Sequence, residues 1–285
     1  MILHTFRYPR EPVTDRVRAK LLFLHGMGGN GSLWRPIAAA LEDDADILCP
    51  DQRGHGGSRV AEPTTAADYT PLISAMDVRE TCAAEGFSPA WVIGHSMGVR
   101  TACGYAKLNP SAVSGLILVD LGFTGVAGGG IGEALSTFLH DLPPTFPARA
   151  AARTFLAKRC PDPSIAQYLL AVSKVDLGTG TLTFPFDHEA LLKTIEASRG
   201  TEAGPWMEEF ARSTGRPVYI LRGSESGVYR AAEFAAERAK YGSVPGVHFL
   251  EVPGASHGLP FEKRPEFVGM IRQWCGIPDR DSPEK

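Results

Sequence analysis

Short apolar runs alternate along most of the chain with longer segments in which apolar residues recur at helical spacing. The runs predict strands at residues 2–8, 20–24, 46–49, 90–93, 115–119, 217–221 and 247–252. The segments between them predict helices at residues 32–41, 71–85, 97–108, 229–240 and 261–274. Strands that alternate with helices are typical of a mostly parallel sheet covered by helices, so we expect an α/β fold.

One stretch interrupts this alternation, from residue 123 to residue 213. It contains Gly128-Gly129-Gly130 and Pro143-Pro144, several amphipathic helical segments, and no run that alternates like a strand. Its leucines and aromatic residues are numerous enough to pack, so we interpret it as a helical insertion and not as a linker. This divides the chain into a core (1–122 and 214–276), an insertion (123–213) and a tail (277–285).

The composition and charge of the chain limit the kinds of binding partner that we expect. The chain has 285 residues, 44% of them hydrophobic, a net charge of −3 and no basic block, so we expect neither nucleic acid nor a membrane as a partner. Five scattered cysteines without C-x-x-C spacing indicate free thiols, and no leader sequence is evident, which together favour the cytoplasm. No His, Asp or Glu cluster has metal-ligand spacing, so we expect no metal and no cofactor. Monomer and homodimer both remain open.

The chemistry begins at the pentapeptide Gly94-His95-Ser96-Met97-Gly98, which follows an apolar run and precedes a predicted helix. A Gly-x-Ser-x-Gly sequence between strand and helix places its serine on a sharp, strained turn, because only glycines let the chain approach itself so closely. The hydroxyl then projects from the sheet edge at the start of a helix. We therefore expect Ser96 to be a nucleophile.

A serine nucleophile needs a base, which is nearly always a histidine. Among the eight histidines, His257 stands out because it lies in Pro253-Gly254-Ala255-Ser256-His257-Gly258, a loop after the last predicted strand. Such a loop would hang over the same sheet edge as Ser96. The side chain of His95 would point the other way, and we predict that His257 is the base.

Acyl transfer also needs N–H donors for the developing oxyanion. The loop His25-Gly26-Met27-Gly28-Gly29 is rich enough in glycine to bring a backbone N–H close to the nucleophile. We expect the N–H groups of Met27 and Met97 to form the pair. His25 and His55, which lie in glycine loops, more plausibly make structural hydrogen bonds.

Four loops together resemble a known family. The sequences His-Gly-Met-Gly-Gly (25–29), Asp-Gln-Arg-Gly-His-Gly-Gly-Ser (51–58), Gly-His-Ser-Met-Gly (94–98) and Gly-Ala-Ser-His (254–257) are similar in kind and order to α/β-hydrolases of the esterase, lactonase and C–C hydrolase branch. The resemblance covers residues 1–276 and implies an eight-stranded, mostly parallel sheet with helices on both faces. It also implies a helical cap between strands six and seven, and a structural role for Asp51 and Arg53.

The third member of the triad departs from the family's usual pattern. In most members an aspartate follows strand seven, but here that stretch reads Gly223-Ser224-Glu225-Ser226-Gly227. The resemblance offers a second position, because part of the superfamily takes its acid from the end of strand six, where Asp120 lies. We favour Asp120, keep Glu225 as the alternative, and assign Ser226 an auxiliary hydrogen bond.

The function expected is cleavage of small to medium carboxylic esters through an acyl-enzyme. The pocket should be apolar, and we expect its walls to include Met27, Met97, Phe123, Val228, Leu259, Trp206, Phe184 and Phe186. No pair of arginines is evidently aimed into it. Two alternatives stay open: a lactone or C–C bond hydrolase with the same triad, and a non-catalytic small-molecule receptor. A serine nucleophile argues against the dehalogenase and epoxide-hydrolase relatives, which use an aspartate there.

Overall fold

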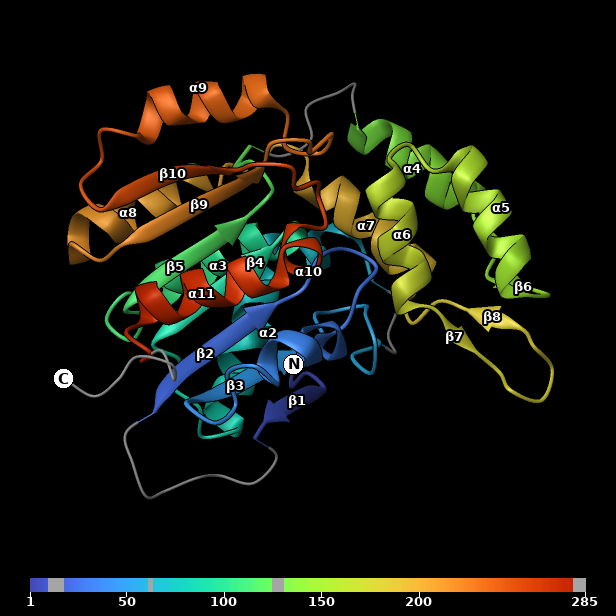
Figure 1. Cartoon of the computed structure of the whole chain (residues 1–285), viewed down its shortest axis with the longest axis horizontal. Helices are drawn as coiled ribbons and strands as arrows, with labels where there is room; N and C mark the ends of the chain where they lie inside the picture. Colours follow the sequence, from blue (N-terminus) through green and yellow to red (C-terminus); the bar gives the residue numbers. More distant parts are fainter. Residues whose placement is uncertain (10–17, 61–63, 125–130, 279–285) are drawn as a thin grey trace.

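The computed structural model describes residues 1–9, 18–60, 64–124 and 131–278. A sheet of seven strands lies at its centre (Figure 1). Its strands are β1 (Thr5–Tyr8), β2 (Ala19–Leu24), β3 (Ala45–Pro50), β4 (Trp91–His95), β5 (Gly115–Val119), β9 (Val218–Gly223) and β10 (Val247–Val252). The strand order is β1-β3-β2-β4-β5-β9-β10. Only β1 runs antiparallel to its neighbour.

The expectation of eight strands was wrong for the described residues, in which the sheet has seven. The seven apolar runs of the sequence each became one strand. The eighth strand had been inferred from the family resemblance alone. The edge strand β1 pairs with β3 on one side, and no strand of the described ranges pairs with its other side.

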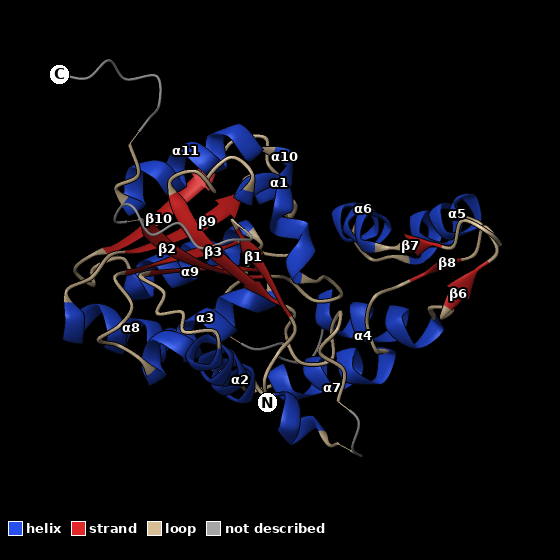
Figure 2. Cartoon of the chain, turned by 90° about the horizontal axis from the view of Figure 1, so that it is seen from below, coloured by secondary structure: helices blue, strands red, loops and turns tan. Residues whose placement is uncertain are grey.

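Successive residues of the inner strands face opposite sides of the sheet, so both faces need cover. Leu22 and Leu24 pack on the face of α2 (Pro71–Ala84), α3 (Met97–Leu108), α8 (Gly204–Thr214) and α9 (Ala231–Tyr241), whereas Leu21 and Phe23 pack on the other. That second face is covered by α1 (Arg35–Ala38) and α11 (Arg264–Cys275). Figure 2 shows the two helical layers on either side of the strands. Two short 3-10 helices, η1 (Gly31–Trp34) and η2 (Ala66–Tyr69), and α10 (Leu259–Glu262) complete the core.

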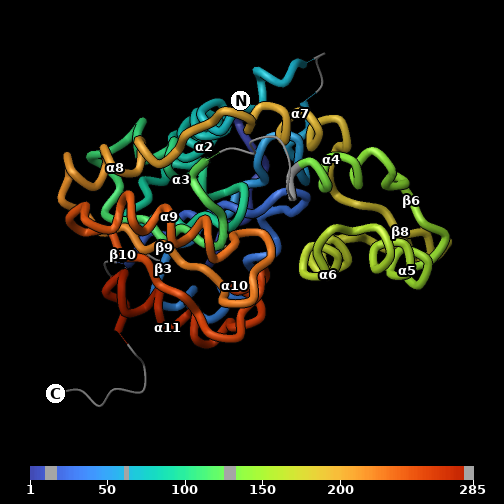
Figure 3. Tube along the Cα trace, turned by 90° about the horizontal axis from the view of Figure 1, so that it is seen from above, coloured from blue at the N-terminus to red at the C-terminus, as the bar shows by residue number. Residues whose placement is uncertain are grey.

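The part of the chain between β5 and β9 that precedes residue 199 lies to one side of the sheet (Figure 3). It contains α4 (Ile131–Asp141), β6 (Thr145–Phe146), α5 (Arg149–Arg159), α6 (Pro163–Val172), β7 (Lys174–Val175), β8 (Leu182–Thr183) and α7 (His188–Ser198). Its buried side chains, among them Phe138, Leu156 and Phe184, form a hydrophobic cluster of their own. The helix α8 packs instead on α3, with Met207 and Phe210 in the main core. The exact division into core and cap stays a prediction.

The interpretation of this insertion as purely helical was wrong, because β6, β8 and β7 form a small antiparallel sheet. Each of these strands has only two residues. An alternation of period two cannot be recognised over two residues, which is why the hydrophobic pattern gave no signal.

Candidate active site

The turn at Ser96 joins β4 to α3 and has the strained geometry that the pentapeptide predicts. Ser96 adopts φ = 53° and ψ = −124°, a conformation that side chains rarely take. A Cβ on Gly94 would lie 2.3 Å from the Gly98 carbonyl oxygen, and one on Gly98 would lie 2.3 Å from the Leu24 carbonyl oxygen. The two glycines are therefore required by the close approach of three backbone segments. The turn is held by the Ser96 N–H, which donates to the Val119 carbonyl at 2.8 Å.

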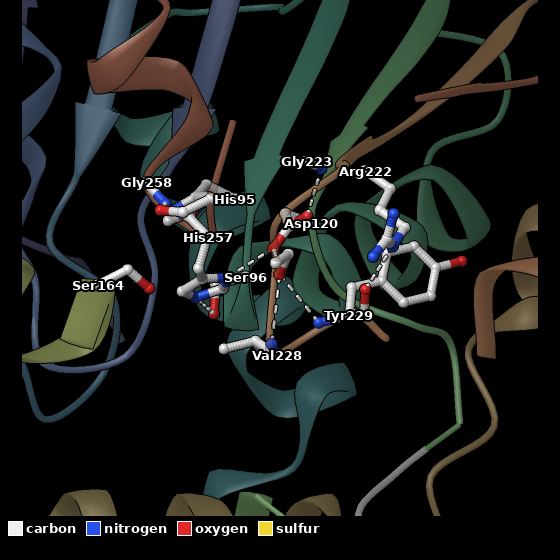
Figure 4. Close-up of polar contacts among 12 residues, drawn as sticks. His95, Ser96, Asp120, Ser164, Arg222, Gly223, Val228, Tyr229, His257 and Gly258 are labelled. Carbon is white, nitrogen blue, oxygen red and sulfur yellow. Dashed lines mark hydrogen bonds and ion pairs between the residues drawn. The ribbon is translucent and has the colours of Figure 1, made fainter. Parts of the chain in front are cut away.

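The structure brings Ser96, His257 and Asp120 together from three separate elements (Figure 4). The loop between β10 and α10 carries His257, whose Nε2 lies 3.1 Å from the Ser96 Oγ. The opposite ring nitrogen, Nδ1, lies 2.8 Å from the Asp120 Oδ2. A donor at Nδ1 leaves the Nε2 lone pair free to accept the serine proton. This is the arrangement that base-assisted attack by a hydroxyl requires.

Asp120 directly follows β5 and is completely buried. Its Oδ1 accepts a hydrogen bond from the Gly223 N–H at 2.8 Å, and its Oδ2 accepts one from the Ser226 hydroxyl at 2.5 Å. With the His257 Nδ1–H, three donors surround the carboxylate, which offsets the cost of burying its charge. Its positive φ of 59° is the second such non-glycine conformation in the described residues, after that of Ser96.

The alternative acid, Glu225, is exposed, and the structure does not bring it to His257. Only its backbone is held, through an N–H that donates to the Ala255 carbonyl at 2.9 Å. Ser226 points inward instead. Besides donating to Asp120, its Oγ accepts hydrogen bonds from the N–H groups of Val228 and Tyr229, both at 3.2 Å. Ser226 therefore links the loop after β9 to the buried carboxylate.

The N–H groups of Met27 and Met97 have no hydrogen-bond acceptor in the described part of the chain. Met97 is the first residue of α3, where N–H groups are unpaired and the helix dipole is positive. Both residues line the pocket that contains Ser96. Two free donors next to the nucleophile can stabilise an oxyanion.

Buried histidines brace the glycine loop that carries Met27. The His55 Nε2 accepts from the Gly28 N–H at 3.0 Å, and the His25 Nε2 accepts from the Gln52 N–H at 2.9 Å. In both rings Nδ1–H donates to a backbone carbonyl. Burial lowers the pKa of His25 to about 4 and that of His55 to about 3, so both are neutral and can accept.

Asp51 and Arg53 make contacts that stabilise the loops near His25 and His55. The Asp51 carboxylate accepts hydrogen bonds from the Gly31 N–H at 2.7 Å and the Gly57 N–H at 2.8 Å. The Arg53 guanidinium makes a bidentate ion pair with Asp77. Neither residue lines the pocket, which agrees with a structural role for both.

The orientation expected for His95 was wrong. Its Nε2–H donates to the His257 carbonyl at 2.8 Å, and the two ring centroids lie 4.9 Å apart. Burial, with a smaller contribution from His257, lowers the pKa of His95 to about 3. The ring therefore stays neutral and ties β4 to the loop of the proposed base. Strand alternation alone did not predict this contact, because the loop folds back over the strand end.

An elongated pocket opens at Ser96 and His257 between the core and the insertion. Most of its wall is apolar, and most of the described residues that line it come from the loop of residues 25–29 and from α2, α3, α4, α6 and α7. Met27, Met97 and Val228 are among them, as expected. Leu259, Trp206, Phe184 and Phe186 are not among the lining residues.

Phe123 does not reach the pocket, contrary to its assignment to the substrate wall. Its side chain is buried in the main core, where its ring packs edge-on against Tyr241 at 5.6 Å. Its N–H donates to Glu237. Phe123 lies four residues beyond the end of β5, and the chain there directs its ring into the core.

Tyr168 and Arg100 are among the pocket residues that the sequence analysis did not name. The hydroxyl of Tyr168 in α6 donates a hydrogen bond to the Gly26 carbonyl at 3.2 Å, so the insertion contacts the loop of residues 25–29. Nothing in the sequence around Tyr168 distinguishes it from a packed helical tyrosine. Arg100 could have been found, because it lies four residues after Ser96 on one helix and therefore on the same side of it.

Other chemistries find no support among the described residues. No group of three or more His, Cys, Asp or Glu side chains there could hold a metal ion. The five cysteines are free thiols, and Cys49, Cys82 and Cys103 are buried. Within the searched ranges no helix has the length and apolar character needed to cross a bilayer.

Comparisons with known proteins agree with this geometry. The family model for the alpha/beta hydrolase fold matches residues 20–158. A 2-(acetamidomethylene)succinate hydrolase of Mesorhizobium japonicum is 29% identical over 253 residues, covering 86% of this chain and 85% of that protein. RutD of Escherichia coli, named for carbamate hydrolysis, is 32% identical over 100 residues, which span only 36% of its own length.

Solved structures extend the likeness to the whole chain. A marine microorganism esterase superimposes with a TM-score of 0.73 at 20% identity, over 96% of this chain and 99% of that one. The chain therefore has the α/β-hydrolase fold. Both of the sequence relatives, the Mesorhizobium protein and RutD, are named as hydrolases.

Proposed function

We propose that the chain is a serine hydrolase that cleaves carboxylic esters of small to medium acyl chain through an acyl-enzyme. The observation that carries the proposal is the continuous hydrogen-bonded series Ser96–His257–Asp120 at the mouth of an apolar pocket. Each of the three residues lies at the carboxyl end of a different core segment. Packing alone gives no reason for a strained serine to face an imidazole there.

In the proposed mechanism, the Ser96 Oγ attacks the ester carbonyl while the His257 Nε2 takes the hydroxyl proton. The Asp120 carboxylate stabilises the imidazolium that forms and fixes the ring orientation. The N–H groups of Met27 and Met97 hydrogen-bond the oxyanion of the tetrahedral intermediate. The proton then passes from His257 to the departing alcohol, and a water molecule activated by the same ring hydrolyses the acyl-enzyme.

The test is covalent labelling of the intact protein by a fluorophosphonate, with the modified peptide identified by mass spectrometry. We expect one label, on Ser96, together with turnover of activated aryl esters. The Ser96→Ala variant should take no label and hydrolyse nothing above background while unfolding at the temperature of the wild type. Labelling elsewhere, or undiminished turnover by the variant, would refute the assignment.

A second candidate keeps these residues but changes the bond that is cleaved. The Mesorhizobium protein that matches most of this chain is named for hydrolysis of 2-(acetamidomethylene)succinate, which favours an amide-like or C–C substrate over a simple ester. A panel of esters, lactones and dienone acids, compared by kcat/KM, separates these options. A receptor would instead retain its ligand tightly with no turnover, although Ser96 and His257 were both intact.

A further inference from the structure

Arg100 forms part of the pocket wall one helical turn after Ser96. Its side chain is buried, with 7% of the residue exposed. The Nη2 group donates to the Thr124 carbonyl at 2.7 Å, whereas Nε is buried without any hydrogen-bond partner. No carboxylate of the described residues lies within ion-pair distance of this guanidinium.

The other buried arginines of the described chain are all paired. Arg18 forms an ion pair with Asp46, Arg222 with Glu251 and Arg272 with Asp44. Arg100 is the exception among the four, and it is also the one that lines the pocket. A buried charge without a partner is unfavourable, so the fold itself gains little from a guanidinium at this position.

The charge nevertheless persists at neutral pH. Burial lowers the pKa of Arg100 only to about 10, and the nearby Glu237 opposes that shift. The Glu237 carboxylate is itself occupied by other donors, the Phe123 N–H at 2.7 Å and the Tyr229 hydroxyl at 2.5 Å. The guanidinium therefore keeps a full positive charge and unused N–H groups.

We infer that Arg100 binds a carboxylate carried by the acyl part of the substrate, which makes the preferred substrates half-esters of short dicarboxylic acids. This inference rests on the proposed function, since it uses Ser96 as the point of attack. Four helical residues rise about 6 Å, so the anion would lie roughly one helical turn from the reacting carbonyl. A guanidinium suits a planar carboxylate because its N–H groups match both oxygens.

The first experiment measures binding without turnover, in the Ser96→Ala variant. Monomethyl glutarate carries one carboxylate, and dimethyl glutarate is its uncharged counterpart of similar size. By calorimetry we expect the half-ester to bind at least about tenfold more tightly than the diester, since a charge-assisted hydrogen bond is lost with the charge. Adding Arg100→Met should abolish this preference and leave the affinity for the diester within about threefold.

The second experiment measures kcat/KM for the same pair with otherwise wild-type protein. Arg100→Met should lower the value for the half-ester at least about tenfold more than the value for the diester, mainly through KM. Its thermal unfolding temperature should equal or exceed that of the wild type, because an unpaired buried charge is removed. Arg272→Met is the matched control: it should lower the unfolding temperature and preserve the preference for the half-ester.

Results that would overturn the role of Arg100 differ from those that would overturn the proposed function. Equal loss of both ligands, or earlier unfolding of Arg100→Met, would show that Arg100 only holds Thr124 and would overturn the inference. Equal binding of both ligands before any change to Arg100 would overturn it as well. If Ser96→Ala binds the half-ester selectively but the wild type hydrolyses neither compound, the proposed function fails while the anion site stands.

Discussion

Replacing Asp120 by Asn should remove most of the activity while leaving the fold in place. An Asn oxygen can still accept from the Gly223 N–H, which lies 2.8 Å from the carboxylate. Its NH2 group would then face the His257 Nδ1 across the 2.8 Å contact, where two donors cannot meet. The ring would have to adopt the tautomer that carries its proton on Nε2. In that form it cannot accept the Ser96 proton, whose oxygen lies 3.1 Å away.

Losing the correct tautomer costs about 10⁴-fold in kcat in serine hydrolases of this kind, or about 5.4 kcal/mol of transition-state stabilisation. The assay is steady-state hydrolysis of p-nitrophenyl acetate, with kcat and KM determined separately and thermal unfolding followed by circular dichroism. The KM should change little, because Asp120 does not line the pocket. The matched control is Glu225→Gln, which changes an exposed acid of the loop after β9 and should keep kcat within about threefold.

Two results would refute the reasoning. Retention of more than about a tenth of kcat in the Asp120→Asn variant would mean that the carboxylate does not set the tautomer. A collapse of kcat in Glu225→Gln, with Asp120→Asn active, would transfer the role to the loop after β9.

Three further outcomes follow from contacts around the site. Gly98→Ala should destabilise the fold by about 3 kcal/mol or more, measured by urea unfolding, because its Cβ would meet the Leu24 carbonyl at 2.3 Å. Ser226→Ala should lower kcat about tenfold through loss of a hydrogen bond to the charged carboxylate, with KM unchanged. The lowered pKa values of His25 and His55 stabilise the fold above pH 6.5, and this stabilisation is lost as the pH falls toward 4; at pH 5 the free energy of unfolding should be lower by about 2 kcal/mol for each ring than at pH 8. A flat stability profile between pH 8 and pH 5 would contradict the neutral, buried state of these rings.

Much of the core could be predicted because its signals are local. The helix Met97–Leu108 and the strand Val247–Val252 have the bounds expected from the sequence. At the start of α2 the Thr70 hydroxyl accepts from the Ile73 N–H, which is the N-cap that a threonine directly before a helix provides. In each case a periodic pattern ends at a residue with its own conformational preference.

Features that depend on tertiary placement could not be predicted from local signals in the sequence. Phe123 illustrates this by contrast with Arg100, since each lies close in sequence to a site residue. Phe123 follows Asp120 by three residues but is sent into the core, whereas Arg100 follows Ser96 by one helical turn and reaches the pocket. Only helical geometry fixes where a nearby residue points, so the loop after β5 gave no reliable direction.

The position of the acid follows from the parallel register of β5 and β9. Val119 pairs with Leu221, and the Asp120 N–H continues the ladder by donating to the Leu221 carbonyl at 2.8 Å. The carboxyl ends of the two strands therefore lie side by side. Ser226 lies in the loop after β9, and its hydroxyl is 2.5 Å from the same Asp120 oxygen that faces His257.

An acid on either strand should thus be able to serve one imidazole. The double variant Asp120→Ser with Ser226→Asp exchanges the two side chains, and its kcat for p-nitrophenyl acetate should exceed that of Asp120→Ser alone by about tenfold to a hundredfold. We expect only partial recovery of kcat, because a carboxylate at position 226 would lack the hydrogen bond that the Gly223 N–H donates to Asp120. The contrary result is a double variant that unfolds at the wild-type temperature and has the same kcat as Asp120→Ser alone. That result would mean that the strained backbone at residue 120 sets the geometry of His257, and not the shared location of the carboxylate.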